Sequence, residues 1–185
     1  LIDMVGDLGV NAFSAISYIA SFSMAVFFGA SEGLQPLFGQ SYGAKKKEDL
    51  KFYFKAGLKI SFFGSAAVTI LAVLFGGYIG SLFGTDAVTR EYMLKVLPQF
   101  AVGFIATAVN VMISSYLYST ERSLLALNIS VLRSIIVNAA VILILPYVFG
   151  ESIIWFSLLI YEVIVLIIAV ALLKHSEKNG IHFKE

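Results

Sequence analysis

Charged residues cluster along this chain and leave long apolar stretches between them. Two of these stretches contain a single charged residue each, Glu32 in one and Glu162 in the other. The segments without any formal charge are residues 60–85, 96–120 and 134–150, and those interrupted once are 8–44 and 152–173. Several of these are long enough to cross the ~30 Å hydrocarbon core of a bilayer as helices. The pattern therefore predicts an all-α integral membrane protein, a bundle of about five transmembrane helices.

Turn residues and short charged segments set the expected helix boundaries. The five helices are expected over about residues 11–42, 48–83, 88–119, 123–145 and 151–173. Gly33 and Pro36 lie inside the first helix, so we expect a bend there. Thr85 or Asp86 is expected to cap the third helix, and Pro146 to stop the fourth. Residues 1–185 are interpreted as a single membrane domain whose first helix is missing or truncated, with a polar cytoplasmic tail at 174–185.

The distribution of lysine and arginine predicts the orientation of the helices. The positive charges concentrate at the connection between the first two helices, at Arg122 and in the tail; at the first connection they are Lys45, Lys46, Lys47, Lys51, Lys55 and Lys59. Basic residues favour the cytoplasmic side. We therefore expect a multi-pass protein of the plasma membrane, with this connection and the C-terminus in the cytoplasm. The lysines are expected to contact membrane lipid headgroups.

Three charges lie deep inside the predicted helices. Glu32, Arg133 and Glu162 are each about twelve residues from a cytoplasmic helix end, which is roughly 18 Å at the helical rise and close to the bilayer midplane. Charges at this depth are costly and usually functional. Glu32 is a candidate to bind a proton, a sodium ion or a cationic substrate; the alternative is a carboxyl group hydrogen-bonded to a neighbouring helix for packing.

Arg133 and Glu162 lie on adjacent antiparallel helices at similar depths. An unpaired arginine is hard to tolerate there, so we expect an intramembrane ion pair. A structural role is favoured over a substrate site. A switch is a further hypothesis, in which protonation of Glu162 releases Arg133.

The third predicted helix has no acid but carries a polar stripe. Its members recur at three- and four-residue spacing: Gln99, Gly103, Thr107, Asn110, Ser114 and Tyr118. Such a stripe faces either a water-filled cavity or another helix, and both interpretations stay open. The face of Glu32 on its own helix also includes Gln35. The candidate substrate and ion pathway is therefore Glu32, Gln35, Gln99, Asn110 and Ser114.

Composition excludes several other functions. The chain is 59% hydrophobic with a mean hydropathy of +0.89, and it contains no cysteine. Its net charge of +1 gives no reason to expect a nucleic-acid partner. His175 and His182 are both in the tail, too isolated for a catalytic triad or a metal site. We therefore expect no enzyme activity, no metal and no cofactor.

Several segments resemble the multidrug and toxic compound extrusion (MATE) family. Residues 29–47, GASEGLQPLFGQSYGAKKK, resemble the second helix of the C-terminal lobe of that family. Further similar segments follow in the same order along nearly the whole chain: 82–88, 118–122 with 130–133, and 146–155 with 161–162. Each piece is weak alone, but their order and spacing make the resemblance fairly specific.

This resemblance implies an antiporter that exports organic cations and drugs in exchange for protons or sodium. Members have twelve helices in two lobes, with a central cavity and alternating access. The implied partners are a small organic cation and the N-terminal lobe. Some members use acids on the first and fourth helices of the C-terminal lobe. Here the first helix is mostly absent, and the fourth has Gln99 and Asn110 in place of an acid. Glu32 is therefore the best acidic candidate in this chain, and an ion site in the missing N-terminal lobe is the alternative.

Two other functions remain alternatives at this point. A lipid-linked-oligosaccharide flippase of the same superfamily should place several basic residues in its cavity for pyrophosphate, whereas here only Arg133 is available. A non-transporting membrane scaffold would use Glu32 for stability alone. A membrane-embedded enzyme is less favoured, because the sequence has no catalytic constellation.

Overall fold

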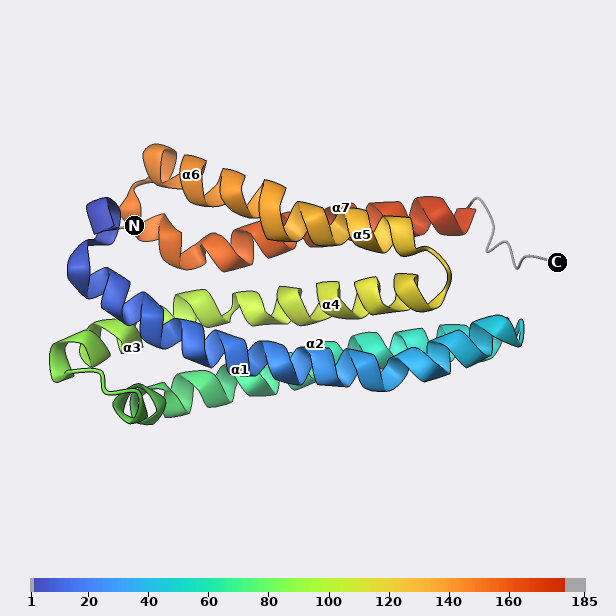
Figure 1. The fold of residues 1–185 in the computed structure, drawn as a ribbon, viewed down its shortest axis with the longest axis horizontal. Helices are drawn as coiled ribbons and strands as arrows, with labels where there is room; N and C mark the ends of the chain where they lie inside the picture. The colour runs from blue at the N-terminus through green and yellow to red at the C-terminus, as the bar shows by residue number, and fades with distance from the viewer. Residues whose placement is uncertain (1, 179–185) are drawn as a thin grey trace.

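The computed structural model describes residues 2–178, and this part of the chain is helical with no strand (Figure 1). The elements are α1 (Ile2–Gly43), α2 (Lys47–Leu82), α3 (Ala87–Ala101), α4 (Gly103–Ser119), α5 (Ser123–Val131), the π-helical η1 (Leu132–Ile136), α6 (Val137–Phe149), the 3-10 helix η2 (Glu151–Phe156) and α7 (Ser157–Lys178). Four helical spans, 6–43, 47–82, 123–149 and 151–176, are long and apolar enough to cross a membrane. Together α3 and α4 form a fifth, bent span. The predicted all-α bundle of about five apolar helices is confirmed.

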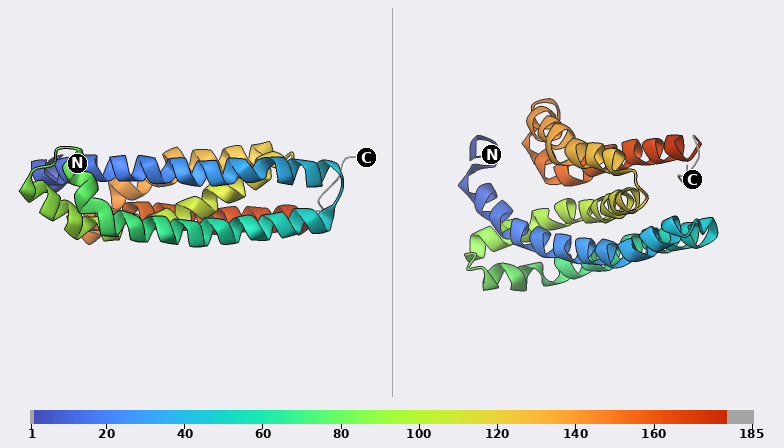
Figure 2. Two further views of the ribbon diagram at one scale, coloured as in Figure 1. Left: turned by 90° about the horizontal axis from the view of Figure 1, so that it is seen from below. Right: turned by 45° about the vertical axis from the view of Figure 1, so that its right-hand side comes forward.

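The central helix of the bundle is α4. It packs against α1 and α2 on one side and against α5 and α7 on the other. Figures 1 and 2 show these two groups as layers on either side of α4. Most side chains of α4 are buried, and two apolar clusters meet along it. Phe104 belongs to the cluster nearer α3, and Met112 belongs to the cluster nearer α5.

The third predicted helix is broken, which corrects the expectation of one continuous helix over about 88–119. It bends by 41° between α3 and α4, at Val102. Gly103, next to the bend, lies so close to α7 that an added Cβ would be 2.8 Å from the backbone nitrogen of Leu159. The Ala101 carbonyl loses its usual partner at the bend and instead accepts a hydrogen bond from the Thr69 hydroxyl of α2, at 3.2 Å.

The fourth predicted helix does not stop at Pro146, which corrects the second boundary. The helix continues to Phe149, and Gly150 (φ 85°) then turns the chain. Pro146 is tolerated because it costs a single backbone hydrogen bond near the helix end. The same helix contains the π-helical turn η1, which the apolar pattern did not reveal.

The first and last helices are longer than expected. α1 begins at Ile2 but consists of two helices that meet at a kink at Gly6 (φ 66°), and its long apolar span covers residues 6–43. Its backbone stays helical at Gly33 and Pro36, so its interruption lies far from the predicted bend. α7 extends beyond 173 to Lys178, and the rest of the predicted tail, with His182, lies outside the described residues.

The connections alternate between the two ends of the bundle. The α1–α2 and α4–α5 turns lie at the same end as the C-terminal end of α7, and the α2–α3 and α6–η2 turns lie at the other (Figure 1). Large apolar side chains are exposed along the flanks, including Phe22 at 74% and Tyr147 at 84% exposure. Such an apolar exterior is suited to contact with lipid.

Candidate functional site

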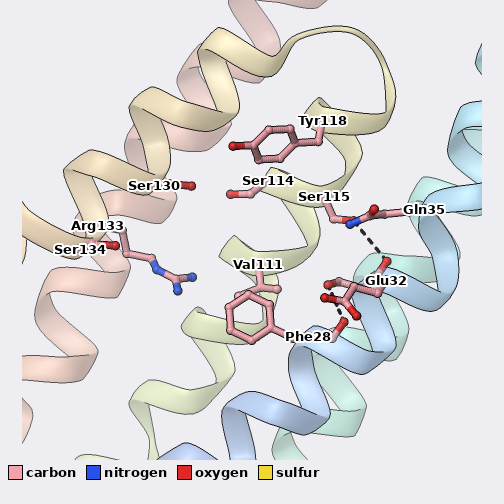
Figure 3. A pocket seen from close by; sticks show the side chains of 11 residues that line it. Phe28, Glu32, Gln35, Val111, Ser114, Ser115, Tyr118, Ser130, Arg133 and Ser134 are labelled. Atoms are coloured by element: carbon pink, nitrogen blue, oxygen red, sulfur yellow. Dashed lines mark hydrogen bonds between the residues drawn. The ribbon is translucent and has the colours of Figure 1, made fainter.

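A polar cavity of about 320 Å³ lies between α1, α4 and the α5–η1 segment (Figure 3). Its two charged residues, Glu32 of α1 and Arg133 of η1, project from opposite sides. The described residues that line it are Phe28, Ser31, Glu32, Gln35, Val111, Ser114, Ser115, Tyr118, Ser130, Arg133 and Ser134. A carboxylate, a guanidinium and several hydroxyls thus share one concave surface, which is the general composition of a site for a polar small molecule.

Local hydrogen bonds hold the wall that carries Glu32. The buried Ser31 hydroxyl donates to the Phe28 carbonyl at 2.9 Å. The Ser115 hydroxyl of α4 donates to the Ser31 carbonyl at 3.2 Å, which joins the two helices beside Glu32. The Glu32 side chain itself is exposed, and no hydrogen bond or ion pair to another described residue engages its carboxylate. Among the described residues, the Glu32 carboxylate thus has no packing partner of the kind that the alternative interpretation requires.

Arg133 contacts the second deep acid from the opposite wall. Its Nε lies 3.7 Å from Glu162 Oε1, and the exposed fractions of the two side chains are 18% and 1%. The two side chains form an ion pair between neighbouring helices, at the two residues for which the sequence predicted one. It also lies at the edge of the cavity, because Arg133 lines the cavity while Glu162 lies behind its wall.

Asn110 holds Glu162 from the side of α4. Its Nδ2 donates to Glu162 Oε2 at 2.7 Å and to the Glu162 carbonyl oxygen at 2.9 Å. Two buried oxygens in this cluster have no hydrogen-bond partner, Glu162 Oε1 and Asn110 Oδ1. Thr107 also lies beside the carboxylate, with its hydroxyl donating to the Gly103 carbonyl at 3.0 Å. Arg133, Glu162 and Asn110 thus form one buried polar cluster.

The polar stripe of the third predicted helix was expected to face either a water-filled cavity or another helix, and its residues do both. Ser114 and Tyr118 line the cavity, as a cavity-facing stripe requires. Gly103 and Asn110 instead contact α7, as a helix-packing stripe requires. Gln99 lies in α3 beyond the bend and does not line this cavity.

Sequence reasoning missed some of the hydroxyl groups of the site. Ser31 and Ser115 flank residues that were singled out, and Ser134 follows Arg133 directly. Their positions next to Glu32, Ser114 and Arg133 were the available signal. Serines are so common at helix contacts in membranes that type and position alone did not distinguish them.

An aromatic cleft of about 600 Å³ adjoins the polar cavity at Phe28, which lines both. Its other aromatic side chains are Phe13, Phe100, Phe104 and Tyr161. The described residues contain no group of three histidine, cysteine or acidic side chains able to hold a metal ion. The chemistry of this surface is therefore that of carboxylate, guanidinium, hydroxyl and aromatic groups.

Comparisons with known proteins agree on one family. Residues 1–144 match the MatE family model. A probable multidrug resistance protein NorM of Halalkalibacterium halodurans is 29% identical over 119 residues, which are 60% of this chain and 26% of that protein. The chain thus spans about a quarter of the length of this curated relative.

Solved structures of transporters share the fold. An outward-facing multidrug resistance MATE family transporter of the MOP superfamily matches with a TM-score of 0.85 at 20% identity, over 97% of this chain and 41% of that one. An inward-facing transporter of the same description matches with a TM-score of 0.85 at 18% identity, over 100% and 43%. These matches show that the described helices have the fold of a multi-pass membrane transporter. The family model over residues 1–144 shows that this chain belongs to the MATE family.

Proposed function

We propose that this chain is the C-terminal lobe of a cation-coupled antiporter that exports organic cations across the plasma membrane in exchange for protons or sodium. The observation that carries the proposal is the unengaged carboxylate of Glu32 on the wall of a polar cavity. A carboxylate without a partner inside an apolar bundle is costly, and binding a cation offsets that cost.

The surroundings of Glu32 suit an organic cation. Hydroxyls from Ser31, Ser114 and Tyr118 supply hydrogen bonds, and Phe28 offers a ring face to a cation or an apolar group. The adjoining aromatic cleft extends this surface for larger ligands. The volumes of about 320 and 600 Å³ fall within the usual range of small-molecule sites.

Alternating access supplies the transport step in this proposal. The chain fits an outward-facing and an inward-facing relative with the same TM-score of 0.85. A lobe of unchanged shape that rocks against a second lobe explains such a fit. The N-terminal lobe is therefore the proposed partner that completes the central cavity.

The connections support a cytoplasmic position for one end of the bundle. The α1–α2 turn, with Lys45, Lys46 and Lys47, lies at the same end as the α4–α5 turn and the C-terminal end of α7 (Figure 1). Because basic residues favour the cytoplasm, we place this end there. The exposed lysines of the first turns of α2 then reach the lipid headgroups.

A flippase of the same superfamily is less well supported. A pyrophosphate needs several cationic partners, and Arg133 is the one basic residue that lines the polar cavity. That residue is also paired with Glu162. A cavity that exposes the carboxylate of Glu32 repels a polyanion.

The test is drug efflux by the two-lobe transporter that contains this chain, carrying Glu32→Gln. Efflux of an organic cation such as ethidium is measured in liposomes with a proton or a sodium gradient imposed in turn. We expect at least about a tenfold loss in the variant, because the mid-membrane charge that holds the cation is gone. The gradient that drives the unaltered protein identifies the coupling ion.

Glu151→Gln is the matched control. Glu151 is exposed at the start of η2, and its substitution by glutamine removes one negative charge, as Glu32→Gln does. The control should retain efflux. Unchanged efflux in a folded, membrane-inserted Glu32→Gln protein contradicts the proposed site and favours the scaffold role of Glu32.

A further inference from the structure

We propose that Arg133 is a tethered cation that exchanges between Glu162 and Glu32: a proton bound at Glu162 releases Arg133, which then takes the place of the cationic substrate at Glu32. The inference rests on the proposed function, because it assigns the coupling step of that same antiport. It makes Glu162 the proton-binding acid and Glu32 the substrate-binding acid.

The geometry of the ion pair between Arg133 and Glu162 allows the two side chains to separate. The distance of 3.7 Å from Nε to Oε1 exceeds that of a hydrogen bond, and Oε1 has no hydrogen-bond partner. Oε2, in contrast, is held by Asn110 at 2.7 Å. A proton can therefore bind at Oε1 while the bond from Asn110 keeps the carboxyl group in place.

The backbone around Arg133 favours a change of position. Arg133 lies in η1, a single π-helical turn between two α-helical segments. Such turns contain one extra residue relative to an α-helix and occur frequently at functional sites. Movement of the π-helical turn along the helix would rotate the Arg133 side chain without disturbing either flanking helix.

The polar cavity provides the path between the two acids. Arg133 already projects into it from the wall opposite Glu32 (Figure 3). Ser130, Ser134 and Ser114 line the space beside the guanidinium and can accept its hydrogen bonds during the movement. Glu32 is exposed to this cavity and unengaged by the described residues, so it can receive the guanidinium.

Charge balance explains why proton and substrate exclude each other. With substrate bound, Glu32 pairs with the substrate and Glu162 pairs with Arg133. With a proton bound, Glu162 is neutral and Glu32 pairs with Arg133. Every deep charge has a partner in both states, whereas a state with proton and substrate together leaves Arg133 unpaired at high cost.

The groups that face Glu162 are consistent with this exchange. From η1 the facing group is the charged Arg133, and from α4 they are the uncharged Asn110 and Thr107. The phenol of Tyr161 is next to it on α7, and across the cavity α1 contributes Glu32. Among the residues that the structure describes around this cavity, two carboxylates and one guanidinium are thus present, and the guanidinium is paired with Glu162.

The test measures binding of tetraphenylphosphonium to the purified two-lobe transporter. Glu162→Gln mimics the protonated acid and should weaken binding at least about tenfold, although Glu162 does not line the cavity. Adding Arg133→Gln to that variant removes the competing cation. The double variant should then bind within about threefold of the unaltered protein.

Proton release supplies a second readout. Addition of tetraphenylphosphonium should release protons from the unaltered transporter in a lightly buffered solution, but not from the double variant. This readout decides the question even if Glu162→Gln alone does not fold, because the double variant removes both charges of the pair together. Lys55→Gln, an exposed loss of positive charge on α2, is the control for Arg133→Gln.

Opposite results overturn the inference. Binding by the double variant as weak as that of Glu162→Gln, or proton release that persists in the double variant, shows that Arg133 does not compete for Glu32. Glu32→Gln is measured in parallel: if it leaves binding unchanged, the proposed substrate site itself is wrong, whatever the double variant does.

Discussion

Single charged residues in this lobe act according to what surrounds them. Glu162 is enclosed and held by Asn110, whereas Glu32 is exposed to a cavity without a partner. Asp86, in the α2–α3 turn, caps α3 by accepting hydrogen bonds from the backbone nitrogens of Val88 and Thr89. An acidic side chain thus caps a helix at Asp86, forms a buried ion pair at Glu162 and, in our proposal, binds a cation at Glu32.

The Asp86 cap gives a pH-dependent prediction. The hydrogen bond from the Thr89 hydroxyl, together with those from the backbone, lowers the pKa of Asp86 below its usual 3.8. Because the folded pKa is the lower one, the stabilisation is complete above about pH 4 and is lost as the pH falls through the folded value. Asp86→Ala should therefore lower the thermal midpoint at pH 7 and make little difference near pH 2.

Thermal unfolding of the detergent-solubilised protein at both pH values measures this effect. Glu91→Ala, an exposed acid on the same helix, is the control. An equal loss at pH 7 and pH 2 would show that Asp86 contributes by something other than its charged cap.

At the scale of the helices, the close contact between α4 and α7 at Gly103 is the central feature of this lobe. Gly103 lets α4 lie directly against α7, and the α3–α4 span bends by 41° next to this contact. The Thr69 hydroxyl satisfies the carbonyl that the bend exposes. This contact also positions Asn110, two turns further along α4, against Glu162.

Gly103→Ala should destabilise the lobe by about 1–3 kcal/mol, because the added methyl group meets backbone atoms of α7 that cannot move aside. Gly64→Ala on α2 is the matched control, since no neighbouring atom lies within 4 Å of its added Cβ. Its expected effect is neutral or slightly stabilising. The free energies of unfolding from denaturant titration compare the two. Equal destabilisation would rule out the α4–α7 contact as the cause.

At the scale of the whole molecule, the lobe presents its polar cavity and aromatic cleft as open concave surfaces between helices. Alternating access requires a second repeat to rock against. We therefore expect residues 1–185 alone, reconstituted in liposomes, to show no gradient-driven efflux. Co-reconstitution with the N-terminal lobe should restore it.

Chemical crosslinking in the liposomes provides the control for self-association. Efflux by a chain that remains monomeric would contradict the two-lobe requirement. Efflux that appears only with a crosslinked homodimer would show that a second copy can replace the partner lobe.

The sequence by itself determined the helices and the deep charges. Uncharged stretches long enough to span a bilayer predict helices, because lipid offers the backbone no hydrogen-bond partner. The cost of charge at that depth singled out Glu32, Arg133 and Glu162 and predicted that the latter two pair. These inferences depend on periodicity and desolvation, which are local properties of the chain.

Only the tertiary structure decided how the helices bend and which polar groups meet. Beside the break at Val102, Gly103 contacts the backbone of α7, which is far away in sequence. The bond from Asn110 to Glu162 joins residues 52 positions apart. Pro146 was predicted to stop a helix, but Gly150 ends it, because a proline near a helix end costs little. The bond from Asn110 to Glu162 and the contact of Gly103 with α7 are contacts between helices, and a hydrophobic pattern does not encode which neighbour a face will meet.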